Sequence, residues 1–120
     1  MRKTCLALAA ATASIFAASP AHATGGYLCK TADGSDLEIA IGFGHVPGAP
    51  VISSRLRVAG RAVPTNMPQW WLGDGEMRLL MTDRDMLEQV LVMQTVDKGR
   101  SFDGWVEWRG KRRWIRCYEN

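Results

Sequence analysis

Two cysteines, Cys29 and Cys117, lie near opposite ends of the segment 24–120 and constrain its fold more than any other feature. In an oxidising compartment, two cysteines in a small domain usually pair. A bond between them would bring the first and last parts of the domain side by side. The rival roles are a metal site and a nucleophilic thiol. A structural metal needs about four ligands, and His45 is the only histidine in this segment. We therefore predict a Cys29–Cys117 disulfide, with no metal and no cofactor.

The first residues indicate the compartment. A basic start, Arg2 and Lys3, precedes an apolar or small-residue run over 5–18 and an A-x-A cleavage site that ends at Ala23. This is the pattern of a secretory signal peptide. The run is shorter than the roughly 20 apolar residues that a membrane-spanning helix needs. We expect a signal peptide over 1–23 and a single domain over 24–120. The product would be a bacterial periplasmic or secreted protein that does not span the membrane.

The leader also carries part of the positive charge. Arg2 and Lys3 are two of the 15 basic residues, so the segment that follows is nearly neutral, with 12 acidic residues. A nucleic-acid-binding domain usually shows a strong basic excess. We therefore expect no nucleic-acid partner.

Most of the chain alternates apolar and polar residues, which is typical of half-buried strands. The clearest case is 37–43. Further strands are expected over 27–31, 51–59, 62–63, 70–72, 77–81, 102–109 and 112–118, separated by tight turns. These turns are rich in glycine, as at Asp33-Gly34, which favours a hairpin.

Residues 83–96 are ambiguous. Thr82 and Asp85 form a capping pair that would suit a helix, with Gly99 after its end. The β-branched residues Val90, Val92, Thr95 and Val96 favour a turn followed by a strand over 86–96, which we adopt. The predicted fold class is then all-β. We expect a small antiparallel meander of about seven or eight strands, closed into a barrel or sandwich by one disulfide.

Residue types suited to catalysis are sparse. With His45 alone, no Ser-His-Asp or Cys-His set can use a second histidine. Acidic pairs such as Asp83 and Asp85 fall at expected turns, where carboxylates are simply solvated. We expect a protein that is not an enzyme and has no catalytic residues.

Trp70 and Trp71 are the first candidates for binding. Neighbouring side chains on a strand point to opposite faces, so one ring can fill the core while the other lies near the surface. An exposed tryptophan is a favoured interface anchor. The alternative is that the irregular segment 64–68 buries both rings.

The second candidate is the basic hairpin over 108–116, which carries Arg109, Lys111, Arg112 and Arg113. Trp105, Trp108 and Trp114 interleave with these cations. Cationic residues around a hairpin can protect strand edges from pairing with other chains. They can also form a patch for an acidic partner, namely an anionic glycan, a lipid head group or a protein. Stacking of arginine on an exposed tryptophan would add roughly 0.5–1 kcal/mol.

The two ends of the segment resemble the small periplasmic and membrane-bound inhibitors of c-type lysozyme. The similarity rests on Tyr27-Leu28-Cys29, the turn Asp33-Gly34-Ser35, the alternating Leu37-Glu38-Ile39 and the closing Arg116-Cys117-Tyr118. It implies a compact antiparallel β-barrel closed by the same disulfide. These inhibitors present a Ser-Gly loop, whereas this chain has Ser53-Ser54-Arg55, so no inhibitory residue is assigned. We expect a binding protein of the cell envelope, most specifically an inhibitor or immunity-like protein, with an anionic glycan or lipid as the alternative partner.

Overall fold

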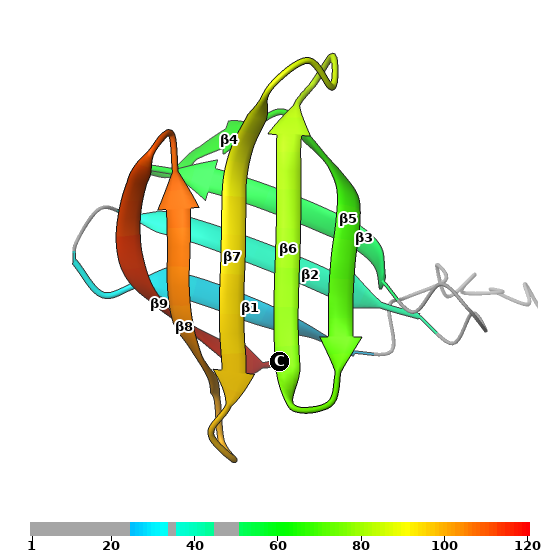
Figure 1. Ribbon diagram of the computed structural model, residues 1–120, viewed down its shortest axis with the longest axis vertical. Coiled ribbons are helices and arrows are strands. Elements are labelled where there is room, and N and C mark those ends of the chain that lie inside the picture. The colour runs from blue at the N-terminus through cyan, green and yellow to red at the C-terminus, as the bar shows by residue number, and fades with distance from the viewer. Residues whose placement is uncertain (1–24, 34–35, 45–50) are drawn as a thin grey trace, which may run out of the picture.

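The computed structural model describes residues 25–33, 36–44 and 51–120, and these residues form nine strands and no helix (Figure 1). The strands are β1 (Gly25–Thr31), β2 (Leu37–Phe43), β3 (Val51–Val58), β4 (Arg61–Val63), β5 (Thr65–Gly73), β6 (Glu76–Asp83), β7 (Gln89–Asp97), β8 (Phe102–Trp108) and β9 (Lys111–Glu119). The all-β prediction is confirmed. The predicted signal peptide and His45 lie outside the described residues.

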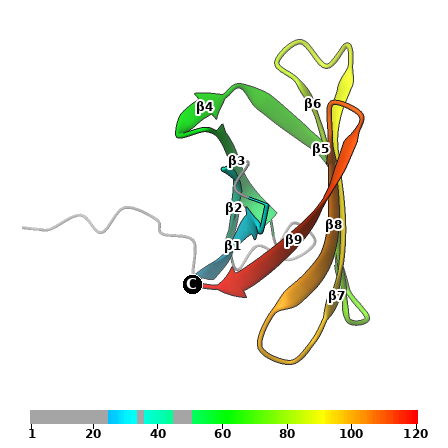
Figure 2. The ribbon, with the colours of Figure 1, turned by 90° about the vertical axis from the view of Figure 1, so that its left-hand side faces the viewer.

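All nine strands belong to one antiparallel sheet, in the order β4-β3-β2-β1-β9-β8-β7-β6-β5. The sheet curls so that β1–β3 lie opposite β5–β8, and β9 runs across from β8 to β1 and joins the two layers (Figure 2). Its two edge strands, β4 and β5, are consecutive in the chain and separated only by Pro64. The result is a nearly closed barrel in which the meander turns back on itself.

The core fills the space between the two layers. Alternate residues of each strand point inward, as the period of two predicts. The fully buried apolar side chains include Ile39 on β2, Leu56 on β3, Met81 on β6, Met93 on β7 and Ile115 on β9. Burial of such side chains is the main favourable term in folding.

The predicted disulfide joins the two strands at which the meander closes. Cys29 on β1 and Cys117 on β9 are paired directly in the antiparallel register, and both are fully buried. The first and last strands are therefore neighbours through both backbone hydrogen bonds and a covalent bond.

One segment differs from the sequence prediction, and another decides between the helix and the strand that the sequence left open. Residues 64–68 were expected to be irregular, but β5 starts at Thr65 and pairs with β6, with a register shift between Asn66 and Gln69. β5 is therefore longer than the strand that was expected over 70–72. The ambiguous segment forms a turn followed by β7, so the strand interpretation is confirmed.

Three hairpins turn on residue pairs that both have positive φ: Ala59-Gly60, Asp74-Gly75 and Arg109-Gly110. Such pairs are typical of two-residue turns whose twist matches that of the flanking strands. The turn at Arg109 sets the register of β8 against β9 and thereby decides which basic side chains face outward.

Candidate functional site

The two neighbouring tryptophans lie on opposite faces of β5, as expected for a strand. Trp70 packs against the core and is half-buried, whereas Trp71 points outward and is 45% exposed. Its indole Nε1 donates a hydrogen bond to the Gly73 carbonyl oxygen at 3.2 Å. The backbone therefore fixes the orientation of an exposed aromatic ring.

The pleat of β9 divides the basic hairpin between two faces. Arg112 points outward, whereas Arg113 has the inward parity and is largely buried, with Nη1 3.3 Å from the Asp33 carboxylate. Arg109 lies in the turn, with its guanidinium 4.8 Å from the Trp108 ring. Lys111 is exposed. The four cations do not form one continuous patch.

Carboxylates also reduce the charge of this hairpin. Arg112 is paired with Glu107 at 3.5 Å, and Arg113 with Asp33. Within the described part of the chain, Arg109 and Lys111 are the hairpin cations without an ion-pair partner. The attraction of the hairpin for an anionic polymer is correspondingly limited.

The structure assembles a different constellation on the outside of β5–β9. Strand register places one outward side chain from each of these five strands in a single row. The row runs Trp71, Arg78, Gln94, Trp105, Trp114. An adjacent parallel row runs Gln69, Leu80, Val92, Glu107, Arg112. We call these two rows the outer face.

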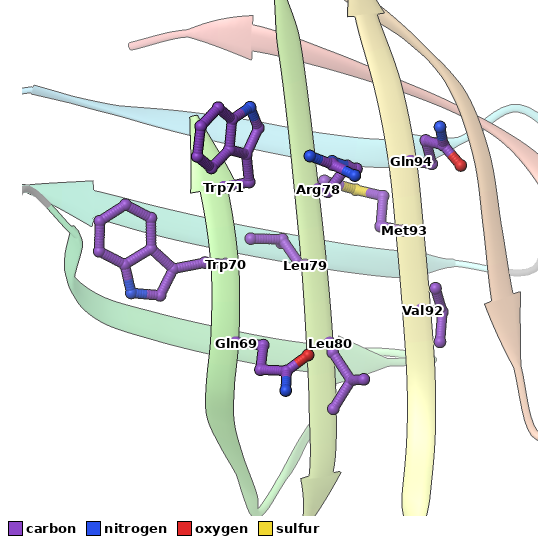
Figure 3. A pocket seen from close by; sticks show the side chains of 9 residues that line it. All are labelled: Gln69, Trp70, Trp71, Arg78, Leu79, Leu80, Val92, Met93 and Gln94. Atoms are coloured by element: carbon purple, nitrogen blue, oxygen red, sulfur yellow. The ribbon is translucent and has the colours of Figure 1, made fainter. Parts of the chain in front are cut away.

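A hollow of about 340 Å³ lies on the β5–β7 part of the outer face (Figure 3). Leu80 and Val92 are apolar side chains on its floor, and Trp71 stands at its β5 side. Polar side chains at its border are Gln69, Arg78 and Gln94. An apolar floor with a few polar groups at its border is the usual composition of a binding site.

Arginines stack on the tryptophans of the outer face. The Arg78 guanidinium lies 5.6 Å from the Trp71 ring centre, and that of Arg112 lies 4.0 Å from Trp105. Glu76 pairs with Arg78 at 3.5 Å. Because each of these guanidinium groups also has a carboxylate partner, the outer face combines aromatic and polar character with little net charge.

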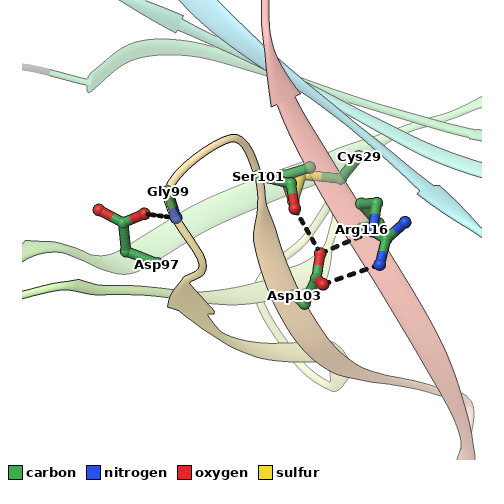
Figure 4. A network of polar contacts seen from close by, with 7 residues as sticks. Cys29, Asp97, Gly99, Ser101, Asp103 and Arg116 are labelled. Atoms are coloured by element: carbon green, nitrogen blue, oxygen red, sulfur yellow. Dashed lines mark hydrogen bonds and ion pairs between the residues drawn. A yellow bond between two sulfur atoms is a disulfide. The ribbon is translucent and has the colours of Figure 1, made fainter.

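A polar network borders the outer face on β8 and β9 (Figure 4). Arg116 donates from Nε and Nη2 to the two carboxylate oxygens of Asp103, at 2.8 and 2.9 Å. The Ser101 hydroxyl donates to the same carboxylate at 2.8 Å. The hydrogen bonds from Arg116 lower the pKa of Asp103, and they outweigh the burial of this carboxylate, which raises the pKa.

This lowered pKa predicts a pH dependence of stability. The ion pair between Asp103 and Arg116 contributes its full stabilisation at pH values above about 3.9, the pKa of aspartate in the unfolded chain. This contribution is lost as the pH falls through the lower pKa of Asp103 in the folded protein. Asp103→Asn should therefore lower the free energy of unfolding at pH 7, and the difference from the native chain should shrink as the pH falls below 4. Urea unfolding at both pH values measures it. A difference that does not change with pH would contradict an ionic origin.

At the far end of the barrel, Tyr27 makes edge contacts with the rings of Phe43 and Phe102. Burial raises its pKa, and the nearby carboxylates of Glu119 and Asp97 raise it further. This cluster lies away from the outer face and contributes packing.

The sequence alone did not identify Arg78, Leu80, Val92 or Gln94 as site residues. Only the register of β5, β6 and β7 places them beside Trp71. The one available signal was the apolar residues at the outward positions of β6 and β7, where a solvated sheet face is usually polar.

Among residues 25–33, 36–44 and 51–120, no group of three or more His, Cys, Asp or Glu side chains is placed to hold a metal ion. None of these residues belongs to a helix long and apolar enough to cross a membrane. Comparisons with protein-family models, with curated proteins and with solved structures give no match.

Proposed function

We propose that this protein acts by binding another protein of the cell envelope, and that the outer face is its contact surface. The observation that carries the proposal is the apolar hollow between Trp71 on β5 and the Trp105–Trp114 pair on β8 and β9. Protein interfaces combine an apolar centre with a polar rim and are enriched in tryptophan, tyrosine and arginine at their strongest contacts. The outer face has this composition.

Pre-organisation supports the proposal. Trp71 is held by its hydrogen bond to Gly73, and Arg112 is held between Trp105 and Glu107. Side chains that are already ordered lose little conformational freedom on binding. Trp114, at 52% exposed, adds a large apolar surface at the other side of the face.

Inhibition of a c-type lysozyme is the most specific version of this proposal. It rests on the resemblance of the two chain ends, and the disulfide between adjacent β1 and β9 agrees with the architecture that the resemblance implies. Stoichiometric addition of the protein should then reduce the lysis of bacterial cell walls by purified c-type lysozyme. Full lysozyme activity at tenfold molar excess would exclude this version but would leave the broader proposal in place.

The broader proposal has its own test. A photo-crosslinking amino acid at position 69, beside the hollow, should form an adduct with one other protein in the native host. The same group at position 57, exposed on β3 in the opposite layer, is the control. Absence of an adduct at 69, or the same adducts at both positions, would contradict the proposal.

For the partner identified in this way, Trp71→Ala should weaken binding about 30-fold, because truncation of a strong interface residue costs about 2 kcal/mol or more. Titration calorimetry with the purified partner measures it. Tyr118→Ala is a matched control, since Tyr118 on β9 is an aromatic residue of similar exposure (52%, against 45% for Trp71) but lies outside the two rows of the outer face. Equal losses in both variants would show that the hollow has no special role.

An anionic glycan or lipid remains the alternative ligand, and Arg109 and Lys111 are the cations that favour it. Binding of this kind should weaken steeply as salt is raised, because exposed charges are screened. Retention on anionic vesicles that falls with salt and with Arg109→Ala would support this alternative over the protein-binding proposal.

A further inference from the structure

The loop between β6 and β7 exposes two adjacent apolar side chains. Met86 is 58% exposed and Leu87 is 81% exposed. The loop projects beyond the neighbouring hairpins at its end of the barrel (Figure 1). Single exposed apolar residues are common on protein surfaces, so exposure alone carries little weight here. The construction of the loop distinguishes it.

Hydrogen bonds hold this loop in one conformation. The Asp83 amide donates to the Glu88 carbonyl oxygen at 3.0 Å and closes the loop, while the Met86 amide donates to the Asp83 carbonyl oxygen at 3.1 Å. The Leu87 amide donates to the Asp83 carboxylate oxygen Oδ1 at 2.8 Å. Asn66 Nδ2, from β5, donates to the Arg84 carbonyl oxygen at 2.7 Å.

The backbone at Met86 is in the left-handed region, with φ of 59°. Glycine or asparagine fits that conformation with little strain, whereas a methionine does not. The braced loop thus keeps a strained methionine in place and points its side chain, with that of Leu87, into solvent. Such strain persists only where the surrounding structure holds it, so the two side chains are presented by a rigid loop.

We infer that Met86 and Leu87 are anchors that enter an apolar pocket with a basic rim on a folded partner protein. This inference rests on the proposed function in one respect, because it takes the protein that contacts the outer face as the partner. The loop adjoins that face through β6 and β7, which supply Leu80 and Val92 to the hollow.

Charge selects a protein pocket over a lipid surface. Asp85 and Glu88 flank the anchors and are exposed, against a single cation, Arg84. Anionic lipids would repel this acidic border, whereas basic groups around a pocket would complement it.

A photo-crosslinking amino acid at position 87 should form an adduct with the same protein that is captured from position 69, and position 57 should not. An adduct at 69 without one at 87 overturns this inference and leaves the proposed function in place. Absence of adducts at both overturns the two together. An adduct with a second copy of this chain would overturn the inference. So would binding of the full chain to vesicles of three parts phosphatidylethanolamine and one part phosphatidylglycerol, if Leu87→Ser abolishes that binding.

The affinity of loop variants for the purified partner distinguishes a binding role of Met86 and Leu87 from a purely structural one. Leu87→Ser should weaken binding at least tenfold without changing the urea midpoint of unfolding. Met86→Gly removes the strain, so it should keep or raise that midpoint and still weaken binding at least fivefold. Tyr118→Ala should leave affinity within twofold. Unchanged affinity in both loop variants would overturn the inference.

Discussion

Replacing both Cys29 and Cys117 by alanine should lower the free energy of unfolding by about 4 kcal/mol, and the melting temperature by roughly 20 °C. The bond closes a loop of 88 residues, almost the whole described chain. Without it, the unfolded chain gains the conformational freedom that a cross-link of this length removes. For a domain whose total stability is on the order of 5–15 kcal/mol, this is a large share.

Urea unfolding of the double variant against the native chain measures the effect. Alanine is the appropriate replacement because both positions are fully buried and would not tolerate an unpaired hydroxyl. Thiol titration of the denatured native chain, without reductant, should detect neither of these two cysteines. A loss of less than 1 kcal/mol would mean that the β1–β9 hydrogen bonds and the packing of the core are enough to keep these two strands paired without the disulfide.

Much of the fold could be predicted because its signals are local. The alternation at 37–43 marks a strand with one buried face, and glycine-containing turns divide the remaining strands. The cysteine positions added the one long-range constraint, which pairs β1 with β9. The strand at 65–68 was missed, because Pro64 and Pro68 indicate irregular structure locally. The register shift between Asn66 and Gln69 accommodates Pro68 within β5, and Pro64 lies just before the strand.

The site was less predictable for a related reason. The sequence predicted that one of the neighbouring Trp70 and Trp71 could lie near the surface, but it did not say which. It also grouped Arg112 with Arg113, whose side chains the pleat sends to opposite faces. A patch made from several strands depends on the register of each pair, and a shift of one residue reverses every side chain. Trp71 and Trp114 share a row only because four successive registers align.

The second large effect on stability is expected at Gly104 on β8, where the backbone of β7 approaches closely. A Cβ atom added there would clash with the Gln94 carbonyl oxygen and would lie 2.7 Å from the Thr95 Cα, both backbone atoms of β7. Neither can move without displacing the β7–β8 pairing. Gly104→Ala should therefore lower the free energy of unfolding by about 3 kcal/mol, at the upper end for added volume in a packed interior.

Gly73→Ala on β5 is the matched control, because its added Cβ would meet nothing closer than the Trp71 ring at 3.7 Å. Away from such clashes, alanine in place of glycine reduces the freedom of the unfolded chain and is neutral or slightly stabilising. Urea unfolding of the two variants compares the same chemical change in two environments. If Gly104→Ala were as stable as Gly73→Ala, β7 and β8 could separate locally without cost. The row from Trp71 to Trp114 would then lack the rigid sheet on which the proposed binding surface depends, since Gln94 and Trp105 are paired across those two strands.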